Sequence, residues 1–263
     1  MRLFRTIAVA FAQYSRIPMP RFEWHDEDMT YSMSVFPWVG AVIGILFTAV
    51  YQLYIRFSIP AFAAALLMTA IPVLITGGFH IDGFMDVSDA LSSYGSREDK
   101  LRILKDPHIG AFSVIRLGLL ALFYIAACMI IISSRSSGAL VYTVSAGFFL
   151  SRALSALAVL TFRSARKEGM LYYEAETAGK GRSANLAFSL IWAAVSSALM
   201  IFTGHITGVI AIIAAICSFG WYKYKSYKEF GGITGDTAGW FVSVCETAII
   251  CGSAVAVILI VNI

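Results

Sequence analysis

Three aspartates stand at a spacing that can bring their carboxylates together. Asp82, Asp86 and Asp89 fall within the largely apolar stretch Thr76–Leu91, and at about 100° per residue a helix places all three within roughly 60° of one another. Like charges this close repel, and burial adds to the cost, so such a face is stable when a cation lies on it. Carboxylate oxygens suit a hard divalent ion, and Mg²⁺ carrying phosphates is the natural candidate. The same spacing also fits a solvated acidic turn between two membrane spans.

A second candidate site is the glycine-rich segment 230–246, which reads FGGITGDTAGWFVSVCE. Successive backbone N–H groups in such a loop can hold a phosphate, and the N-terminus of the helix that follows favours negative charge. Asp236 could add a metal ligand, or it could only cap the helix. The candidate substrate-binding residues of this segment are Gly232, Thr234 and Gly235.

Glycines and basic residues flank the three aspartates. Gly77 and Gly78 weaken the helix just before them and let the backbone approach a ligand. Ser96 and Asp99 have the spacing of a capping box, so a short basic helix is expected from there to the break at Asp106–Pro107. Positive charge beside metal-bound acids is what a diphosphate requires. The candidate substrate ligands of this loop are Arg102, Lys105 and Asp106.

Three further ionisable residues lie in or beside apolar runs. His80 could accept a proton, although a lone histidine at such a position is more often a hydrogen-bonded structural residue. Arg152 falls near the middle of a predicted span, where an unpaired cation is costly. It either binds an anion in a polar cavity or pairs with a buried acid. Glu246, deep in the last apolar run, either pairs with Arg152 or faces the site.

The composition indicates that membrane helices position these residues. Of 263 residues, 59% are hydrophobic and 14% are charged, whereas soluble domains carry about 25% charged residues. The four cysteines lie in apolar runs without a C-x-x-C pair, which gives no support for a disulfide framework or a zinc site. Runs long enough to cross a bilayer occur at 35–55, 59–76, 111–132, 138–161, 186–202, 205–222 and 238–261. The expected fold is all-α: one membrane-embedded domain over residues 1–263, a polytopic helical bundle of about seven transmembrane spans.

The distribution of Lys and Arg predicts the orientation of these spans. From the N-terminus to the C-terminus, the segments outside the spans carry 4, 1, 4, 1, 5, 0, 3 and 0 basic residues. By the positive-inside rule, the N-terminus and every loop with candidate site residues lie in the cytoplasm. The expected location is the bacterial cytoplasmic (inner) membrane. The N-terminal apolar run Ile7–Ala12 is short and fits an interfacial or re-entrant helix, and Gly40 and Gly44 form a G-x-x-x-G pattern that permits close helix packing.

Taken together, the motifs resemble the cobalamin synthase family, the membrane adenosylcobinamide-GDP ribazoletransferases of late vitamin B12 synthesis. The resemblance covers nearly the whole chain in the family's order. It is weak in the segment 162–185, and Phe112 and Ser113 stand where many members carry a more glycine-rich stretch. The motifs that carry it are SRIPMP, FPWVGAVIG, TGGFHIDGFMDVSDAL, LKDPHIGAFSVI, LSRAL and GGITGDTAGWFVSVCE.

The resemblance implies a transferase that joins adenosylcobinamide-GDP to α-ribazole, or to its 5′-phosphate, and releases GMP. The ribose 3′-hydroxyl would be the nucleophile, and the bond broken would lie within the diphosphate. Mg²⁺ held by the three aspartates, with Asp236 closing the other side, would neutralise the diphosphate. Asp82, Asp86 or His80 would accept the hydroxyl proton, and Arg102, Lys105 and Arg152 would bind phosphate.

Two alternatives from other classes stay open. One is another Mg²⁺-dependent membrane phosphotransferase, of the CDP-alcohol type or an aspartate-rich prenyltransferase. The other is a transporter in which the aspartates bind a coupling cation and no product is made. The expected partners are the corrinoid-GDP and α-ribazole substrates and membrane lipid, with no nucleic acid. A homo-oligomer or an assembly with other corrinoid enzymes stays open.

Overall fold

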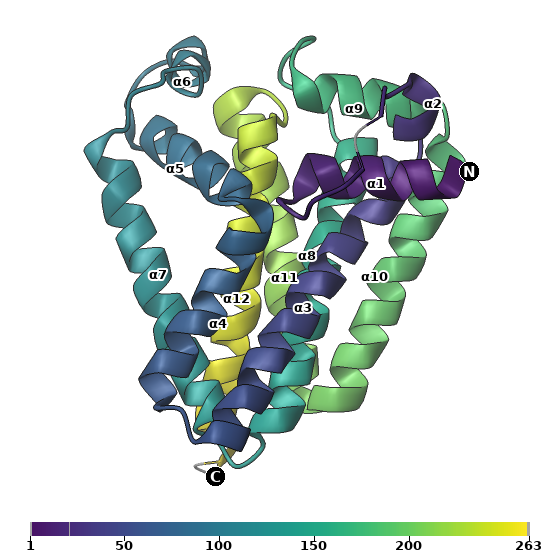
Figure 1. Cartoon of the computed structure of the whole chain (residues 1–263). Helices are drawn as coiled ribbons and strands as arrows, with labels where there is room; N and C mark the ends of the chain where they lie inside the picture. Colours follow the sequence, from purple (N-terminus) through teal and green to yellow (C-terminus); the bar gives the residue numbers. More distant parts are fainter. Residues whose placement is uncertain (1, 21, 262–263) are drawn as a thin grey trace.

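All regular elements of the described chain are helical, which confirms the expected all-α class (Figure 1). The computed structural model describes residues 2–20 and 22–261; Arg21, one of the basic residues counted before the first span, lies outside them. The elements are α1 (Arg2–Tyr14), α2 (Asp26–Met29), α3 (Ser32–Phe57), α4 (Ala61–Thr76), α5 (Phe79–Ser92), α6 (Arg97–Ile103), α7 (Ala111–Ile132), α8 (Ser137–Thr161), α9 (Met170–Gly179), α10 (Arg182–Gly204), α11 (Ile206–Lys225), the π-helix η1 (Ser226–Phe230) and α12 (Gly235–Val261).

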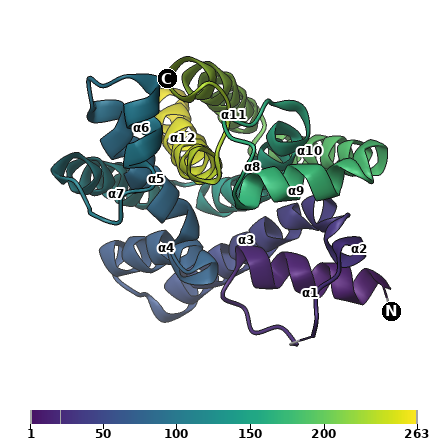
Figure 2. The same ribbon diagram turned by 90° about the horizontal axis from the view of Figure 1, so that it is seen from above.

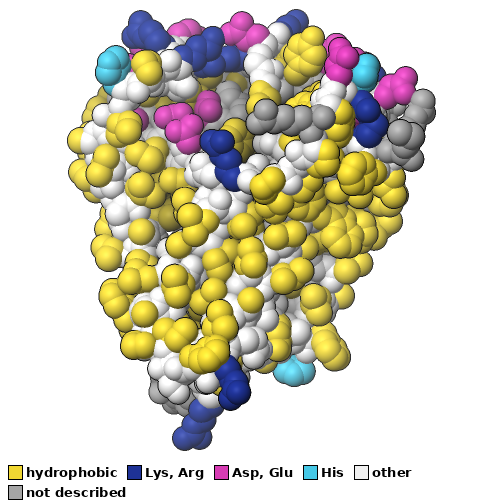
Figure 3. All heavy atoms as spheres, in the orientation of Figure 1, with side chains coloured by type: hydrophobic (Ala, Val, Ile, Leu, Met, Phe, Trp, Pro, Cys, Tyr) yellow, Lys and Arg dark blue, Asp and Glu magenta, His cyan; other side chains and the backbone are white. Residues whose placement is uncertain are grey.

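The long helices form a bundle, and the short helices gather at one end of it. Among the described helices, six are long and apolar enough to cross a membrane: α3, α7, α8, α10, α11 with η1, and α12. On the face shown in Figure 3, hydrophobic side chains cover the body of the bundle. The acidic side chains and most of the basic ones lie at the end that carries α2, α5, α6 and α9, and a few basic side chains lie at the opposite end. We call this end the polar end. The chain is a multi-pass membrane protein.

The second predicted span is interrupted. The helix α4 has 16 residues, about 24 Å, which is shorter than the hydrocarbon core of a bilayer. At Gly77 and Gly78 the backbone takes φ values of +66° and +83°, a region that favours glycine. The helix α5 consequently leaves at 94° to α4 and lies along the polar end. The expected seven crossings are reached only if this bent pair counts as one of them.

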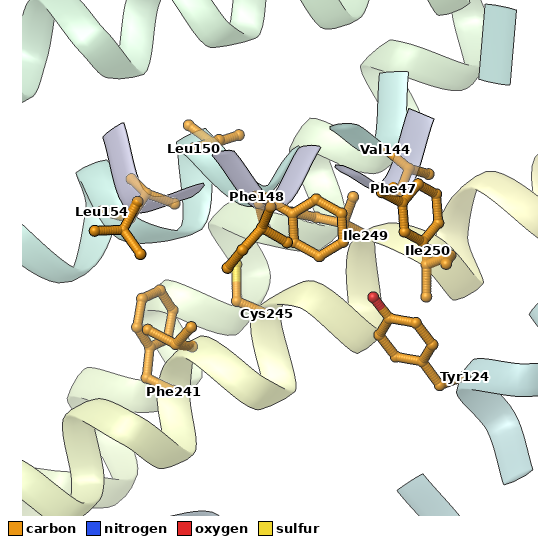
Figure 4. Close-up of a cluster of buried hydrophobic side chains, with 14 of the residues drawn as sticks. Phe47, Tyr124, Val144, Phe148, Leu150, Leu154, Phe241, Cys245, Ile249 and Ile250 are labelled. Atoms are coloured by element: carbon orange, nitrogen blue, oxygen red, sulfur yellow. The ribbon is translucent and has the colours of Figure 1, made fainter. Parts of the chain in front are cut away.

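The core is centred on α8, which packs against α3, α10, α11 and α12. A side-chain carbon at Gly40 would overlap the Phe148 carbonyl oxygen, and one at Gly44 would lie 2.5 Å from the Ser145 oxygen. The G-x-x-x-G pattern therefore lets α3 and α8 pack backbone against backbone, as the sequence predicted. Figure 4 shows the adjoining apolar layer, where Phe47 of α3 and Phe148 of α8 meet residues of α12.

Three helices lie across the polar end instead of running with the bundle: α1, α5 and α9 (Figures 1 and 2). The helix α1 exposes the apolar side chains of Leu3 and Phe4, while Ala8 and Val9 are buried. Its position across the end of the bundle fits an interfacial helix, and the location of α1 at a membrane interface stays a prediction. The three helices enclose the polar residues described next.

Candidate active site

A cavity at the polar end brings together the two candidate sites of the sequence, the aspartates of α5 and the glycine-rich segment. It lies where α5, α9 and the start of α12 meet the segment 164–169. Asp82 and Asp236, which are 154 positions apart in the printed sequence, both line it. The polar residues around this cavity include His80, Asp82, Arg166, Glu174, Thr234 and Asp236.

Direct backbone contact between α5 and α12 makes this meeting possible. A side-chain carbon at Gly83 would lie 2.7 Å from the Asp236 carbonyl oxygen, and one at Gly239 would lie 3.2 Å from the Cα of His80. The Ser243 hydroxyl of α12 also donates a hydrogen bond to the His80 carbonyl oxygen at 3.1 Å. Because both contact positions are glycine, the two helices approach closely enough for their acids to share one cavity.

The aspartates form a cluster of negative charge, as the helical spacing predicts. Burial, followed in order of effect by the charges of Asp82, Asp236 and Asp89, raises the pKa of Asp86 to about 6. Among the described residues, however, no three His, Cys, Asp or Glu side chains converge closely enough to form a complete metal site. An ion here would therefore take part of its coordination from a bound ligand, which is the usual arrangement for Mg²⁺ at phosphate sites.

Asp89 already has a structural role in this cluster. One of its carboxylate oxygens accepts a hydrogen bond from the Gly110 N–H at 2.8 Å, and the other accepts one from the Ser113 N–H at 2.9 Å. These N–H groups belong to the start of α7, so Asp89 caps that helix and fixes it against α5. A metal role for Asp89 stays a prediction.

The glycine-rich segment is held in place by its own hydrogen bonds. The Thr234 N–H donates to the Thr237 hydroxyl at 2.8 Å, and the Thr237 N–H donates to the Thr234 hydroxyl at 3.2 Å. This reciprocal cap begins α12 at Gly235, and the first N–H groups of the helix have no partner within it. The positive end of the α12 dipole is therefore directed at the cavity that Asp236 lines.

Gly232 lets this segment pair with residues that precede α9. The Ile233 N–H donates to the Arg163 carbonyl at 2.9 Å, and the Ala165 N–H donates to the Ile233 carbonyl at 2.8 Å. A side-chain carbon at Gly232 would overlap the Arg163 carbonyl oxygen. The pairing carries Arg166 to the cavity, where its positive charge acts on Asp236.

Sequence reasoning missed three charged residues of the cavity, Arg166, Glu168 and Glu174. All three lie in the segment where the family resemblance is weak, and Arg166 stands in an irregular loop that periodicity does not describe. A signal for Glu174 was present nonetheless. It follows the buried Leu171 by three residues and precedes the buried Ala178 by four, so it occupies the apolar face of a short amphipathic helix.

The predicted basic helix forms, but its charged residues lie outside the cavity. The capping box is present, with the Asp99 N–H donating to the Ser96 hydroxyl at 3.2 Å. Arg102 pairs with Asp99, and Asp106 bonds to His108. Lys105 pairs with Glu168, a residue of the cavity rim, at 2.7 Å. Substrate contacts of Arg102, Lys105 and Asp106 stay predictions.

The two glycines before α5 line a second cavity on its other side. Gly77, Gly78 and Asp82 share that cavity with Arg16 and Trp24. Asp82 therefore stands between two hollows of the polar end, one with the glycine-rich segment and one with the N-terminal segment. Such a position suits a residue that must meet two substrates.

Arg152 and Glu246 form an ion pair between α8 and α12. Arg152 is fully buried and also donates to the Phe148 carbonyl at 2.9 Å, while Glu246 is 7% exposed. Neither residue is among those described as lining the cavity. The sequence left open whether Arg152 binds an anion or pairs with a buried acid, and in the structure it pairs with a buried acid.

Breaking this pair is expected to destabilise the protein strongly. Arg152→Met leaves the Glu246 carboxylate buried without its cation, which costs about 3–5 kcal/mol of unfolding free energy. The double variant Arg152→Met, Glu246→Met removes both charges and is expected to be clearly more stable than the single variant. Thermal unfolding in detergent, followed by tryptophan fluorescence, measures both. A single variant as stable as the wild type would show that the pair contributes nothing to the packing of α8 on α12.

Known proteins are similar to this chain along almost its full length. Residues 6–254 match the family model described as cobalamin-5-phosphate synthase. The adenosylcobinamide-GDP ribazoletransferase of Lachnoclostridium phytofermentans is 37% identical over 246 residues, covering 94% of this chain and 92% of the relative. Those of Clostridium perfringens and Rhizobium johnstonii are both 32% identical, over 248 and 256 residues, and cover 94% and 95% of this chain and 96% and 95% of the relatives.

No solved structure matches the chain. The family model nevertheless covers almost its full length, and it includes both the aspartate helix α5 and the glycine-rich start of α12. The resemblance first seen in the motifs is thereby confirmed. The chain belongs to the cobalamin-5-phosphate synthase family.

Proposed function

We propose that this protein is an adenosylcobinamide-GDP ribazoletransferase that joins adenosylcobinamide-GDP to α-ribazole, or to its 5′-phosphate, and releases GMP. The names of its relatives support the substrates. The observation that carries the proposal is the meeting of Asp82 and Asp236 in one cavity beside the start of α12. Acids, a guanidinium and a helix N-terminus together are suited to a diphosphate, the group that is cleaved.

We further propose that the reaction depends on Mg²⁺. The donor set fits this ion, because Asp82, Asp86 and Asp236 offer hard carboxylate oxygens and repel one another without a cation. When bound, Mg²⁺ would neutralise charge on the diphosphate and stabilise GMP as the leaving group. Asp82 and Asp236 would hold it from two helices, and the phosphate oxygens would complete its coordination.

The residues of the chain itself would align the reacting groups. Arg166 and the first N–H groups of α12 would bind phosphate oxygens on the side away from α5. The ribose hydroxyl would attack the phosphorus next to the cobinamide, in line with the bridging oxygen that departs with GMP. Because Asp82 stands between the two hollows, the nucleophile and the leaving group would approach it from different sides.

The polar end would face the cytoplasm of the bacterium, and the protein would reside in its inner membrane. The segments at the polar end carry nearly all Lys and Arg residues, while the opposite end carries Arg56 and Arg135. By the positive-inside rule this distribution favours a cytoplasmic polar end. GMP would then be released on the side where nucleotides are used.

Purified protein in lipid nanodiscs, incubated with adenosylcobinamide-GDP, α-ribazole and Mg²⁺, tests the function directly. We expect equal amounts of GMP and adenosylcobalamin to form. Movement of substrate across a sealed membrane without any new product would support the transporter instead. Release of CMP from a CDP-alcohol, with no turnover of the corrinoid, would support the other phosphotransferase.

Removal of divalent metal is expected to stop this reaction reversibly. Because several kcal/mol of transition-state stabilisation depend on the ion, EDTA should lower the rate by at least about 100-fold, and excess Mg²⁺ should restore it. Helical content by circular dichroism should stay unchanged, since helix packing and backbone hydrogen bonds hold the described acids in place. Full turnover in EDTA would contradict the magnesium proposal while leaving the transferase activity standing.

A further inference from the structure

An acid on the far side of the cavity has no part in the phosphate site described above. Glu174 of α9 is 8% exposed and lines the cavity together with Tyr14 of α1, which is 4% exposed. The two helices lie across the polar end next to each other (Figure 2). Glu174 thus faces the same space as Asp82 and Asp236, but from another element.

The polar groups around Glu174 are incompletely satisfied. The Gln13 side-chain amide donates a hydrogen bond to one carboxylate oxygen of Glu174. The Tyr14 hydroxyl faces the carboxylate without forming a well-aligned hydrogen bond to any described side chain, and the Gln13 amide oxygen also lacks a partner among them. No Lys or Arg of the described chain pairs with Glu174. Buried polar groups in this state call for a polar ligand, and a sugar hydroxyl has the matching donor and acceptor.

We propose that Glu174 accepts the proton of the attacking ribose hydroxyl, and that Gln13 and Tyr14 position its carboxylate. This inference rests on the proposed transferase function. The hydroxyl oxygen forms a bond to the phosphorus next to the cobinamide, and the bond from that phosphorus to the bridging oxygen breaks. GMP leaves with the bonding electron pair, and the proton passes to a carboxylate oxygen of Glu174.

The sequence-derived candidates for this role are less suited to it. Asp82 and Asp86 belong to the acidic cluster that a cation neutralises, which makes a carboxylate a weaker base. The His80 ring packs against Phe36 and Phe79, with ring centroids 6.1 Å and 5.6 Å apart. Glu174, in contrast, is a buried acid that lines the cavity and pairs with no cation of the described chain.

Its ionisation is also matched to neutral pH. Burial raises the pKa of Glu174 to about 7, while the Gln13 amide and the Tyr14 hydroxyl that faces the carboxylate act in the opposite direction. A base works best when its pKa lies near the working pH. The other titratable or charged groups around the cavity are His80, Asp82, Arg166, Glu168, Tyr172 and Asp236.

The test compares Glu174→Gln with the wild type in nanodiscs, with GMP release measured between pH 5.5 and 9. The substituted amide would keep the hydrogen bond from Gln13 but cannot take a proton. We expect kcat to fall by at least about 100-fold, and the rise of wild-type kcat through pH 7 to disappear from what remains. Glu176→Gln is the matched control, because Glu176 is exposed on the same helix; its rate and pH profile should equal those of the wild type.

Thermal unfolding separates this role from a structural one. The folded-state pKa of Glu174 is raised, so the carboxyl favours the folded state less and less as pH rises from about 4 through about 7. The neutral glutamine lacks this loss, so at pH 8 Glu174→Gln should melt at the same temperature as the wild type or higher. A catalytic defect in a protein of undiminished stability is then a defect of proton transfer.

Two results would overturn the inference and can be told apart. If Glu174→Gln releases GMP at half the wild-type rate or more, or keeps the rise through pH 7, Glu174 is not the proton acceptor and the transferase function stands. If the wild type itself releases no GMP from adenosylcobinamide-GDP and α-ribazole, the proposed function fails, and the role of Glu174 fails with it.

Discussion

Asp82→Asn is expected to abolish GMP release, with a loss of at least about 1,000-fold, in a protein that still folds. Asp82 is exposed at the cavity and, alone among the described residues, lines both cavities beside α5 and also belongs to the acidic cluster. Asparagine keeps its shape but removes the charge that would hold Mg²⁺ on the diphosphate. Loss of several kcal/mol of transition-state stabilisation corresponds to a rate change of this size.

Asp86→Asn should also lose turnover. Unlike most substitutions of buried residues, which destabilise the fold, it should make the protein more stable. Burial and three neighbouring carboxylates raise the pKa of Asp86 to about 6, so its ionised form is unfavourable in the fold above that pH. The neutral side chain removes this repulsion, and the melting temperature at pH 8 should rise.

Asp26→Asn, at an exposed acid of α2, is the control for both variants and should leave activity and stability unchanged. Near-normal turnover of Asp82→Asn would remove the metal role of the cluster.

Gly83→Ala is expected to lower turnover by about 100-fold although glycine has no side chain to bind a substrate. The added methyl would lie 2.7 Å from the carbonyl oxygen and 3.0 Å from the Cα of Asp236, both of them backbone atoms that cannot rotate away. The helices α5 and α12 must therefore separate, and Asp82 and Asp236 separate with them. A displacement of about 1 Å in a site that aligns reacting groups can cost a factor of this size.

The control for this prediction is Gly118→Ala in α7. A methyl there would meet nothing within 4 Å, and alanine in a helix is favoured over glycine by about 0.5–1 kcal/mol. Gly118→Ala should therefore keep full activity and melt slightly higher. Steady-state kinetics and thermal unfolding of the two variants, side by side, test the contact. A Gly83→Ala protein with wild-type kinetics would mean that the two helices need not touch for the reaction.

Much of the fold follows from hydropathy, because lipid-facing helices must be apolar along their full length. The seven apolar runs correspond to α3, α4, α7, α8, α10, α11 and α12. Short motifs were equally informative. Gly40 and Gly44 predicted close helix packing, and Ser96 and Asp99 predicted the start of a helix. The direction of α5 could not be predicted, since glycine at 77 and 78 permits a sharp bend without specifying its angle.

The aspartates and the glycine-rich segment of the candidate site were predicted, whereas Arg166, Glu168 and Glu174 were not. Helical spacing placed Asp82, Asp86 and Asp89 on one face, but nothing local assigns Asp89 to the cap of α7. The meeting of Asp82 with Asp236 depends on tertiary packing, which one sequence does not reveal. Arg166 is brought to the cavity because Ile233 forms backbone hydrogen bonds with Arg163 and Ala165. Such pairing between irregular segments leaves no periodic signal in the sequence.

Electron–nuclear double resonance on Mn²⁺, bound in place of Mg²⁺, tests the central claim most directly. The protein in nanodiscs is loaded with adenosylcobinamide-GDP while α-ribazole is withheld, so that the diphosphate stays intact. We expect one Mn²⁺ per chain with a ³¹P coupling from the diphosphate, and we expect Asp82→Asn to lose both the ion and the coupling. Nucleotide that binds without Mn²⁺, or a ³¹P coupling that persists unchanged in Asp82→Asn, would contradict a metal held on the diphosphate by α5.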